Sequence, residues 1–153
     1  ETGVYNSILE AIANGTNRVT AISDRIHEER SKCTKYLQVL QNIRLIKKTI
    51  PCGQPKNSKK GIYAIADHYY RFWYRYTFSQ KNYYFLLGEK NAAQEIMDRI
   101  SDYMGPIFEE ICTEYLLRQA KAHNLPFIPA ELGKWWGTNP ILHRQDRKRR
   151  HLL

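Results

Sequence analysis

Residues 67–76 read DHYYRFWYRY, and six of these ten side chains are aromatic. So much rigid apolar surface must be buried in a core or used to bind a partner. At helical spacing one face collects Tyr69, Phe72, Trp73 and Tyr76. His68, Arg71 and Arg75 point mostly away from that face. The spacing therefore predicts a core helix, and the alternative is a platform on which nucleobases stack between the arginines.

The formal net charge is +9, and the basic residues concentrate at the two ends of the chain. Residues 1–60 hold 11 basic and 5 acidic side chains, residues 61–133 hold 7 and 9, and residues 134–153 hold 6 and 1. A localised positive surface attracts polyanions, which favours nucleic acid over a small neutral substrate. The alternative is a basic surface that only keeps the protein soluble.

The composition argues against several other classes. Three cysteines without C-x-x-C spacing indicate neither a disulfide framework nor a zinc knuckle, and the histidines show no helical pair. No window approaches the roughly 18 consecutive apolar residues of a membrane span, and the N-terminus lacks a secretory signal. We therefore expect a cytoplasmic protein with no metal and no membrane partner.

The first 66 residues show the most regular pattern. Apolar residues at helical spacing predict helices over residues 4–14, 18–26 and 31–42, the first of them ended by Gly15. Residues 44–50 and 61–66 read as two strands, and the loop between them is rich in turn formers. Three helices followed by a hairpin predict a winged helix-turn-helix over residues 1–66.

In that geometry, the third helix is the candidate reader of double-stranded DNA, and lysines at the hairpin tip would contact phosphates. The predicted DNA-binding residues are Arg30, Ser31, Lys32, Thr34, Lys35 and Gln38 on the helix, with Lys56, Lys59 and Lys60 at the tip. Many winged helices instead dock proteins, so a protein-interaction role stays open.

Residues 67–130 are expected to be helical. Asp67 can cap the aromatic helix, and Gly105-Pro106 is predicted to separate a helix over residues 92–103 from another over residues 107–124. Residues 83–88 form a short apolar segment whose structure the pattern does not decide. Apolar stripes that the winged helix leaves uncovered would favour a homodimer.

Five segments resemble one protein family when they are read in order: YNSILEAIANG, TKYLQVLQNIRLIKK, KKGIYAIADHYYRFWYRY, YMGPIFEEICTEYL and ELGKWWGTNP. They resemble the C-terminal region of the archaeal-type AAA ATPases, in which a DEXX-box ATPase module precedes this region. The resemblance extends to about residue 140. It implies a winged helix followed by a domain similar to the restriction-endonuclease, PD-(D/E)XK, fold, and an ATPase module as a partner in the full-length protein.

The resemblance also implies a metal-binding acid. In the nuclease-like fold, a helical acid joins an aspartate and a glutamate-x-lysine from adjacent strands to bind a divalent metal. By resemblance, Glu109 would be the helical acid in an intact relative. Where those strands are expected, this chain reads ILHRQDRKRRHLL, with Asp146 as the only acid. We expect an incomplete nuclease site. The sequence leaves open whether the basic tail is native or arises from a truncation or a change of reading frame.

The chain also lacks a phosphate-cradling loop of the G-x-x-x-x-G-K-[ST] type. The nearest approach, residues 53–60, has no glycine before its lysine. ATP and Mg²⁺ are therefore expected only for full-length relatives, and this chain is expected to have no cofactor and no catalytic activity.

Together these patterns predict a mainly α (α+β) protein. Residues 1–66 would form the winged helix-turn-helix with its small β hairpin, residues 67–130 a helical region, and residues 131–153 the start of an incomplete nuclease-like domain with a basic tail. The predicted function is DNA binding within a multidomain ATPase. The alternatives are a protein-interaction or dimerisation module of that ATPase and a metal-dependent nuclease with an incomplete active site.

Overall fold

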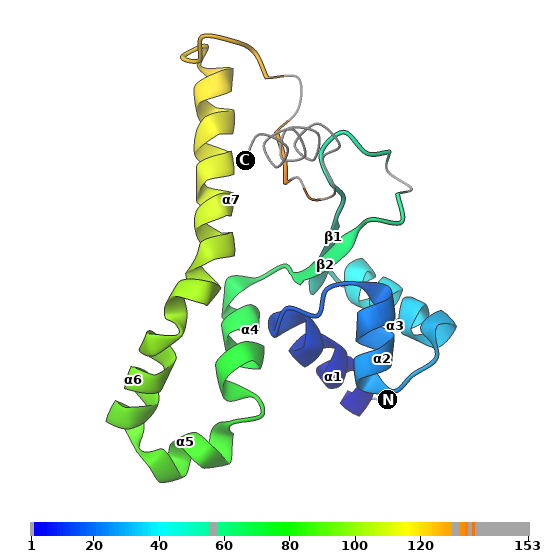
Figure 1. The fold of residues 1–153 in the computed structure, drawn as a ribbon, viewed down its shortest axis with the longest axis vertical. Helices are drawn as coiled ribbons and strands as arrows, with labels where there is room; N and C mark the ends of the chain where they lie inside the picture. The colour runs from blue at the N-terminus through cyan, green and yellow to red at the C-terminus, as the bar shows by residue number, and fades with distance from the viewer. Residues whose placement is uncertain (1, 56–57, 130–131, 135, 137–153) are drawn as a thin grey trace, which may run out of the picture.

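The chain folds into helices with a two-stranded antiparallel sheet, as a computed structural model shows (Figure 1). The structure describes residues 2–55, 58–129, 132–134 and 136. The expected mainly α (α+β) class is confirmed. The elements in chain order are α1 (Thr2–Ala13), α2 (Val19–Ile26), α3 (Arg30–Asn42), β1 (Ile46–Thr49), β2 (Ile62–Ile65), α4 (His68–Phe72), the π-helical turn η1 (Trp73–Thr77), α5 (Lys81–Leu87), α6 (Glu89–Asp98) and α7 (Ile100–Lys121).

Helices α1, α2 and α3 enclose the main core with the hairpin, and we call this part the helix–hairpin unit. Ile8, Ile22 and Leu37 are fully buried there, each supplied by a different helix. Gly15 ends α1 as expected. Its N–H donates to the Ile12 carbonyl, and its positive φ of 91° turns the chain so that the Thr16 N–H reaches the carbonyl of Ala11. The three predicted helices are present with boundaries shifted by at most two residues at either end.

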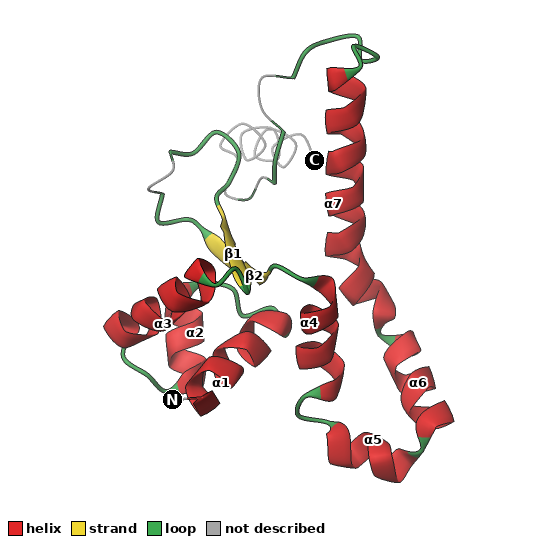
Figure 2. Ribbon diagram, turned by 180° about the vertical axis from the view of Figure 1, so that it is seen from behind, coloured by secondary structure: helices red, strands yellow, loops and turns green. Residues whose placement is uncertain are grey.

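The hairpin has one face toward the core and one toward α7. Its register pairs Ile46 with Ile65 and Lys48 with Tyr63. Because strand side chains alternate between faces, these four residues share the core side, and three of them are buried. The opposite face carries Lys47 and lies beside the long helix α7 (Figure 2).

The aromatic run forms a helix between α1 and α7, but one inward position differs from the prediction. Asp67 caps α4 by accepting a hydrogen bond from the Tyr70 N–H at 3.0 Å. Tyr76 is 2% exposed, whereas Tyr69 is 68% exposed and was wrongly expected to face the core. The helix widens into η1 after Phe72, and it has neighbours on two sides. The Tyr74 hydroxyl therefore reaches Asn6 of α1.

The second half of the chain turns back along the first. Helices α5 and α6 form the bend, and α7 runs past the hairpin, as both ribbon views show. The predicted break at Gly105-Pro106 is wrong, because α7 continues through Pro106 and the chain instead turns at Arg99. An internal proline removes one backbone hydrogen-bond donor, and the remaining backbone hydrogen bonds of a long helix can keep it continuous past the proline.

Among the described residues, no helix has the length and apolar character to cross a membrane. Most of residues 131–153 lie outside the described part, including Asp146 and the basic tail.

Candidate functional site

Helix α3 presents the predicted polar face to solvent. Its opposite side is anchored by Cys33, Leu37 and Leu40, which are at most 2% exposed. This burial fixes the rotation of the helix, because residues three and four apart share a face. The six helix residues of the predicted DNA site are all exposed, namely Arg30, Ser31, Lys32, Thr34, Lys35 and Gln38.

Two acids lie beside this basic face at the start of α3. Lys32 Nζ pairs with Glu28 Oε2 at 3.0 Å, and this hydrogen bond, with the charge of Glu28, raises the pKa of Lys32. The Ser31 hydroxyl donates to Glu29 at 2.8 Å. In the described part of the chain, neither Arg30 nor Lys35 forms an ion pair. Arg30 and Lys35 are therefore the cations of α3 most available to an incoming anion.

The hairpin loop adds further lysines. Lys59 and Lys60 are exposed, and Lys56 lies outside the described residues. Residues after α7 brace this loop, because the Trp136 indole donates to the Lys60 carbonyl at 3.0 Å and the Cys52 N–H donates to the Lys134 carbonyl at 2.8 Å. The loop is thus supported at both of its ends.

Lys48 is an exposed cation that was not among the predicted DNA-binding residues. Its ammonium lies 5.9 Å from the centroid of the Tyr63 ring, on the core side of the hairpin where α3 packs against β1. Strand alternation, with Ile46 inward, was the signal that could have placed Lys48 on the same side as α3.

Glu109, the acid implied by the nuclease resemblance, is exposed on α7 and pairs with Lys134 at 2.8 Å. Its backbone carbonyl accepts a hydrogen bond from the Thr113 hydroxyl. Among the described residues, no three His, Cys, Asp or Glu side chains are grouped as a metal site. The acid expected on a following strand, Asp146, falls outside those residues.

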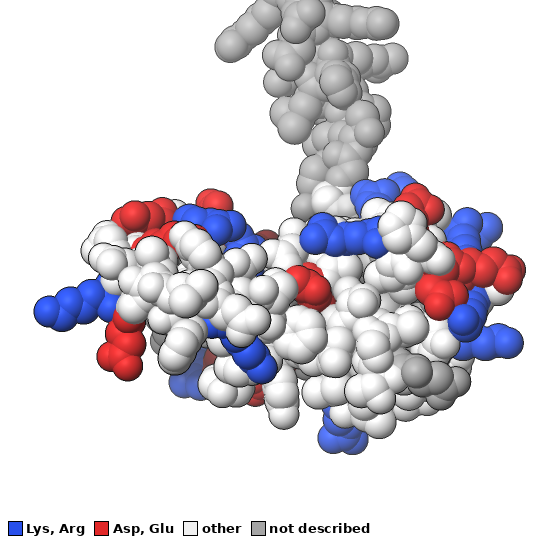
Figure 3. Space-filling view, turned by 90° about the horizontal axis from the view of Figure 1, so that it is seen from below, with Lys and Arg blue, Asp and Glu red and all other residues white. Residues whose placement is uncertain are grey.

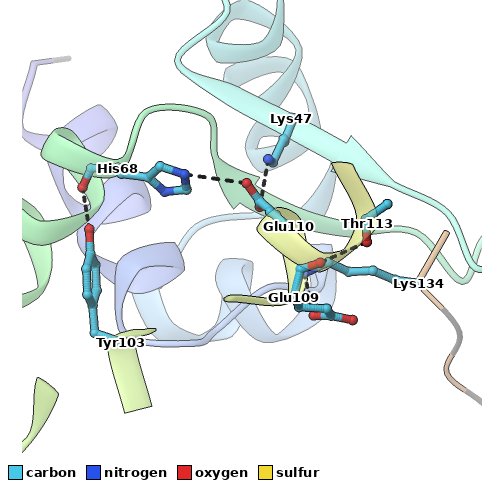
Figure 4. A network of polar contacts seen from close by, with 7 residues as sticks. All are labelled: Lys47, His68, Tyr103, Glu109, Glu110, Thr113 and Lys134. Atoms are coloured by element: carbon cyan, nitrogen blue, oxygen red, sulfur yellow. Dashed lines mark hydrogen bonds and ion pairs between the residues drawn. The ribbon is translucent and has the colours of Figure 1, made fainter. Parts of the chain in front are cut away.

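The neighbouring Glu110 is the centre of a polar network between the hairpin and α7 (Figure 4). Its carboxylate contacts Lys47 of β1 at 2.9 Å and His68 of α4 at 3.5 Å. The Tyr103 hydroxyl in turn donates to the His68 carbonyl at 2.7 Å. Sequence spacing gave no sign of this network, because its members are far apart in the chain.

The network shifts the pKa of Glu110. Partial burial raises it, but the hydrogen bond from Lys47 and the positive charges of Lys47, His68 and Lys134 outweigh burial and lower the pKa overall. Glu110 therefore holds α7 against the hairpin as a carboxylate.

Comparison with known proteins gives a family match without an assigned activity. Residues 73–147 match the model of a family described as archaea bacterial proteins of unknown function. An uncharacterized protein of Methanocaldococcus jannaschii is 32% identical over 136 residues, covering 89% of this chain and 30% of that protein. This chain thus spans less than a third of the length of the relative it matches. No solved structure matches it.

Proposed function

We propose that the helix–hairpin unit is a winged helix that binds double-stranded DNA, within a larger protein that resembles the archaeal-type AAA ATPases. The observation that carries the proposal is the division of α3 into a buried apolar side and an exposed side with Arg30 and Lys35. Such a helix can enter the major groove while exposed loop lysines meet phosphates. In this proposal the chain itself is catalytically silent, and ATP and Mg²⁺ belong to the longer protein.

The archaeal relative extends well beyond the segment that matches this chain, which leaves room for an attached ATPase module in a longer protein. A DNA-binding region would place an attached ATPase on its substrate without contributing chemistry. The exposed residues Lys48, Lys59 and Lys60 would extend the phosphate contacts of α3 onto the hairpin.

An electrophoretic mobility shift with duplex DNA at two salt concentrations tests this proposal. Lys35→Glu is expected to weaken binding about tenfold and to reduce the salt dependence, because a phosphate contact is replaced by repulsion. Lys90→Glu makes the same charge change on exposed α6 and should have little effect. Lys32→Glu is a poorer choice because it would place a second acid beside Glu28. Equal loss in the Lys35 and Lys90 variants would contradict the proposed interface.

A second candidate function, protein interaction or dimerisation, is favoured by apolar surface on the second half of the chain. Phe85 and Leu86 of α5 are 86% and 84% exposed, and Phe108, Ile111 and Tyr115 of α7 are all more than half exposed. Figure 3 views the molecule from below and shows uncharged side chains over much of this face, with Lys, Arg, Asp and Glu side chains among them. Apolar side chains gathered on an exposed surface mark interaction sites.

Sedimentation measurements over a range of protein concentrations test the dimer. If a second copy covers α7, Phe108→Glu should shift the protein toward monomer, because an acid would be buried in the contact. Ile43→Glu changes an exposed apolar residue of the helix–hairpin unit and serves as the matched control. A monomer at every concentration would exclude dimerisation through α7.

A further inference from the structure

A cavity of about 250 Å³ lies where the end of α1, strand β2, the aromatic helix and α7 meet. One wall is apolar and includes Ile12 and Ile65. The opposite side carries charged groups, Arg71 and Arg75 from the aromatic helix and Asp102, Glu110 and Lys134. The sequence pattern predicted that both arginines would point mostly away from the core, and they instead line this cavity, half-buried.

The two arginines lack adequate hydrogen-bond acceptors. Within the described residues Arg71 forms no ion pair, and its guanidinium lies 5.0 Å from the centroid of the Tyr103 ring. Arg75 donates from Nη1 to the Ala13 carbonyl over 3.4 Å, and its Nε is buried without a partner. Guanidinium groups taken out of water normally receive carboxylates or other acceptors.

Burial acts on Arg71 in the direction expected for a cation taken out of water. It lowers the pKa of Arg71, and the charge of Arg75 adds to the lowering. The aromatic contact with Tyr103 is favourable to a cation but supplies no lone pair to the guanidinium N–H groups.

The acids of the cavity offset these arginines only in part, because burial lowers the pKa of Arg71 more than the charge of Glu110 raises it. Glu110 is engaged by Lys47 and His68, and Lys134 is paired with Glu109 outside the cavity wall. Asp102 is exposed at the start of α7 and, in the described part of the chain, forms no ion pair. The cavity lining holds three cations, Arg71, Arg75 and Lys134, against two acids, Asp102 and Glu110, and an anion would be disfavoured close to those acids.

We propose that this cavity binds a small oxyanion, a phosphate or carboxylate group on a small apolar body, through Arg71 and Arg75. Two guanidinium groups one helical turn apart provide planar N–H donors that match phosphate and carboxylate oxygens. The apolar wall from α1 and β2 would cover the rest of the ligand. This site is separate from the DNA face of α3, so either proposal can fail without the other.

Thermal unfolding with phenyl phosphate, benzoate or inorganic phosphate tests the site, with sodium chloride keeping ionic strength constant. We expect a saturable rise in unfolding temperature for at least one probe, and the preferred probe distinguishes phosphate from carboxylate. The double variant Arg71→Gln/Arg75→Gln should weaken this binding at least about tenfold, because both charge-assisted donors are lost. Arg118→Gln, on the exposed end of α7, and Lys35→Glu, on α3, should both keep it.

A second measurement covers the case in which the double variant does not fold. In the wild-type protein, the side-chain Nε–H signal of Arg75 in a ¹H–¹⁵N NMR spectrum should shift on titration with the preferred probe, while the backbone amides of α3 stay in place. Absence of saturable binding by all three probes would overturn the proposal. So would shifts confined to α3, or undiminished binding by a folded double variant.

Discussion

Tyr76 joins the two halves of the molecule. Its ring lies 5.1 Å from that of Phe72 and 6.0 Å from that of Tyr103, measured between centroids. Its hydroxyl donates to the Arg99 carbonyl at 3.0 Å, where the chain turns from α6 into α7. One side chain thus supplies both apolar contact and a backbone hydrogen bond at the bend. Its inward direction was predictable from helical spacing, but its partner Tyr103 was not.

Substitution at Tyr76 should separate these two contributions. Tyr76→Phe keeps the ring contacts and should cost about 1 kcal/mol, the usual value of one such hydrogen bond. Tyr76→Ala should cost about 3–5 kcal/mol, because a large buried ring is removed. The free energy of unfolding in urea measures both changes. Tyr69→Ala, at an exposed position of the same helix, should stay within about 0.5 kcal/mol, and a comparable loss there would contradict this account.

At the scale of elements, the contact of the hairpin with α7 depends on Glu110. Strand β1 contributes Lys47, α4 contributes His68, and α7 contributes the carboxylate that both approach. A cleft of about 350 Å³ beside this contact is lined by residues of both hairpin strands and α7. The Lys47–Glu110 pair therefore links the hairpin to α7 beside this cleft.

The contact should weaken in acid. The pKa of Glu110 is lower in the folded state than in the unfolded chain, where a glutamate titrates near about 4.3. At pH values between the folded and the unfolded pKa, the unfolded state therefore binds more protons. The contribution of the Glu110 carboxylate to the free energy of unfolding is then complete above the unfolded pKa, and it is lost as pH falls through the folded pKa.

Urea unfolding of the wild type and of Glu110→Gln across this pH range measures the effect. The difference in unfolding free energy between the two proteins should be largest near neutral pH and shrink in acid. Glu114→Gln alters an exposed pair with Arg118 and is the matched control. A difference that does not change with pH would show that the carboxylate charge plays no part.

The whole molecule divides into a helix–hairpin unit with a closed core and a second half whose helices are largely exposed. Most fully buried side chains belong to the helix–hairpin unit, whereas α7 beyond Glu110 carries exposed apolar residues such as Ile111 and Leu117. Stability is not uniform in such an arrangement, because local opening costs least where few apolar contacts are lost.

Amide hydrogen exchange should reveal this difference. Backbone amides of residues 111–121 are expected to exchange faster than those around Leu37 in α3, which is fully buried. The experiment is best run at low and at high protein concentration. Equal protection of the two segments at low concentration would contradict an uncovered α7, and protection of α7 only at high concentration would support the dimer.

The sequence predicted the parts of this fold that depend on local pattern. Helical spacing located α1 to α3, and alternation located the hairpin. The network around Glu110 and the positions of Arg71 and Arg75 arise because α7 returns beside the hairpin. The spacing of apolar residues within one segment does not predict where a distant helix packs. Both arginines were therefore predicted to point mostly away from the core. The basic face of α3 was predictable because burial of Leu37 fixes the rotation of the helix about its axis.

The hydrogen bond between the Trp136 indole and the Lys60 carbonyl places an intrinsic fluorophore at the hairpin loop. Indole emission depends on the polarity of its surroundings and on the hydrogen bond of its N–H. A ligand that settles on the lysines of the hairpin loop would change both, and its arrival could be followed in unlabelled protein. Replacing Trp136 with phenylalanine would then remove that part of the optical change and leave any signal from the other two tryptophans, Trp73 and Trp135.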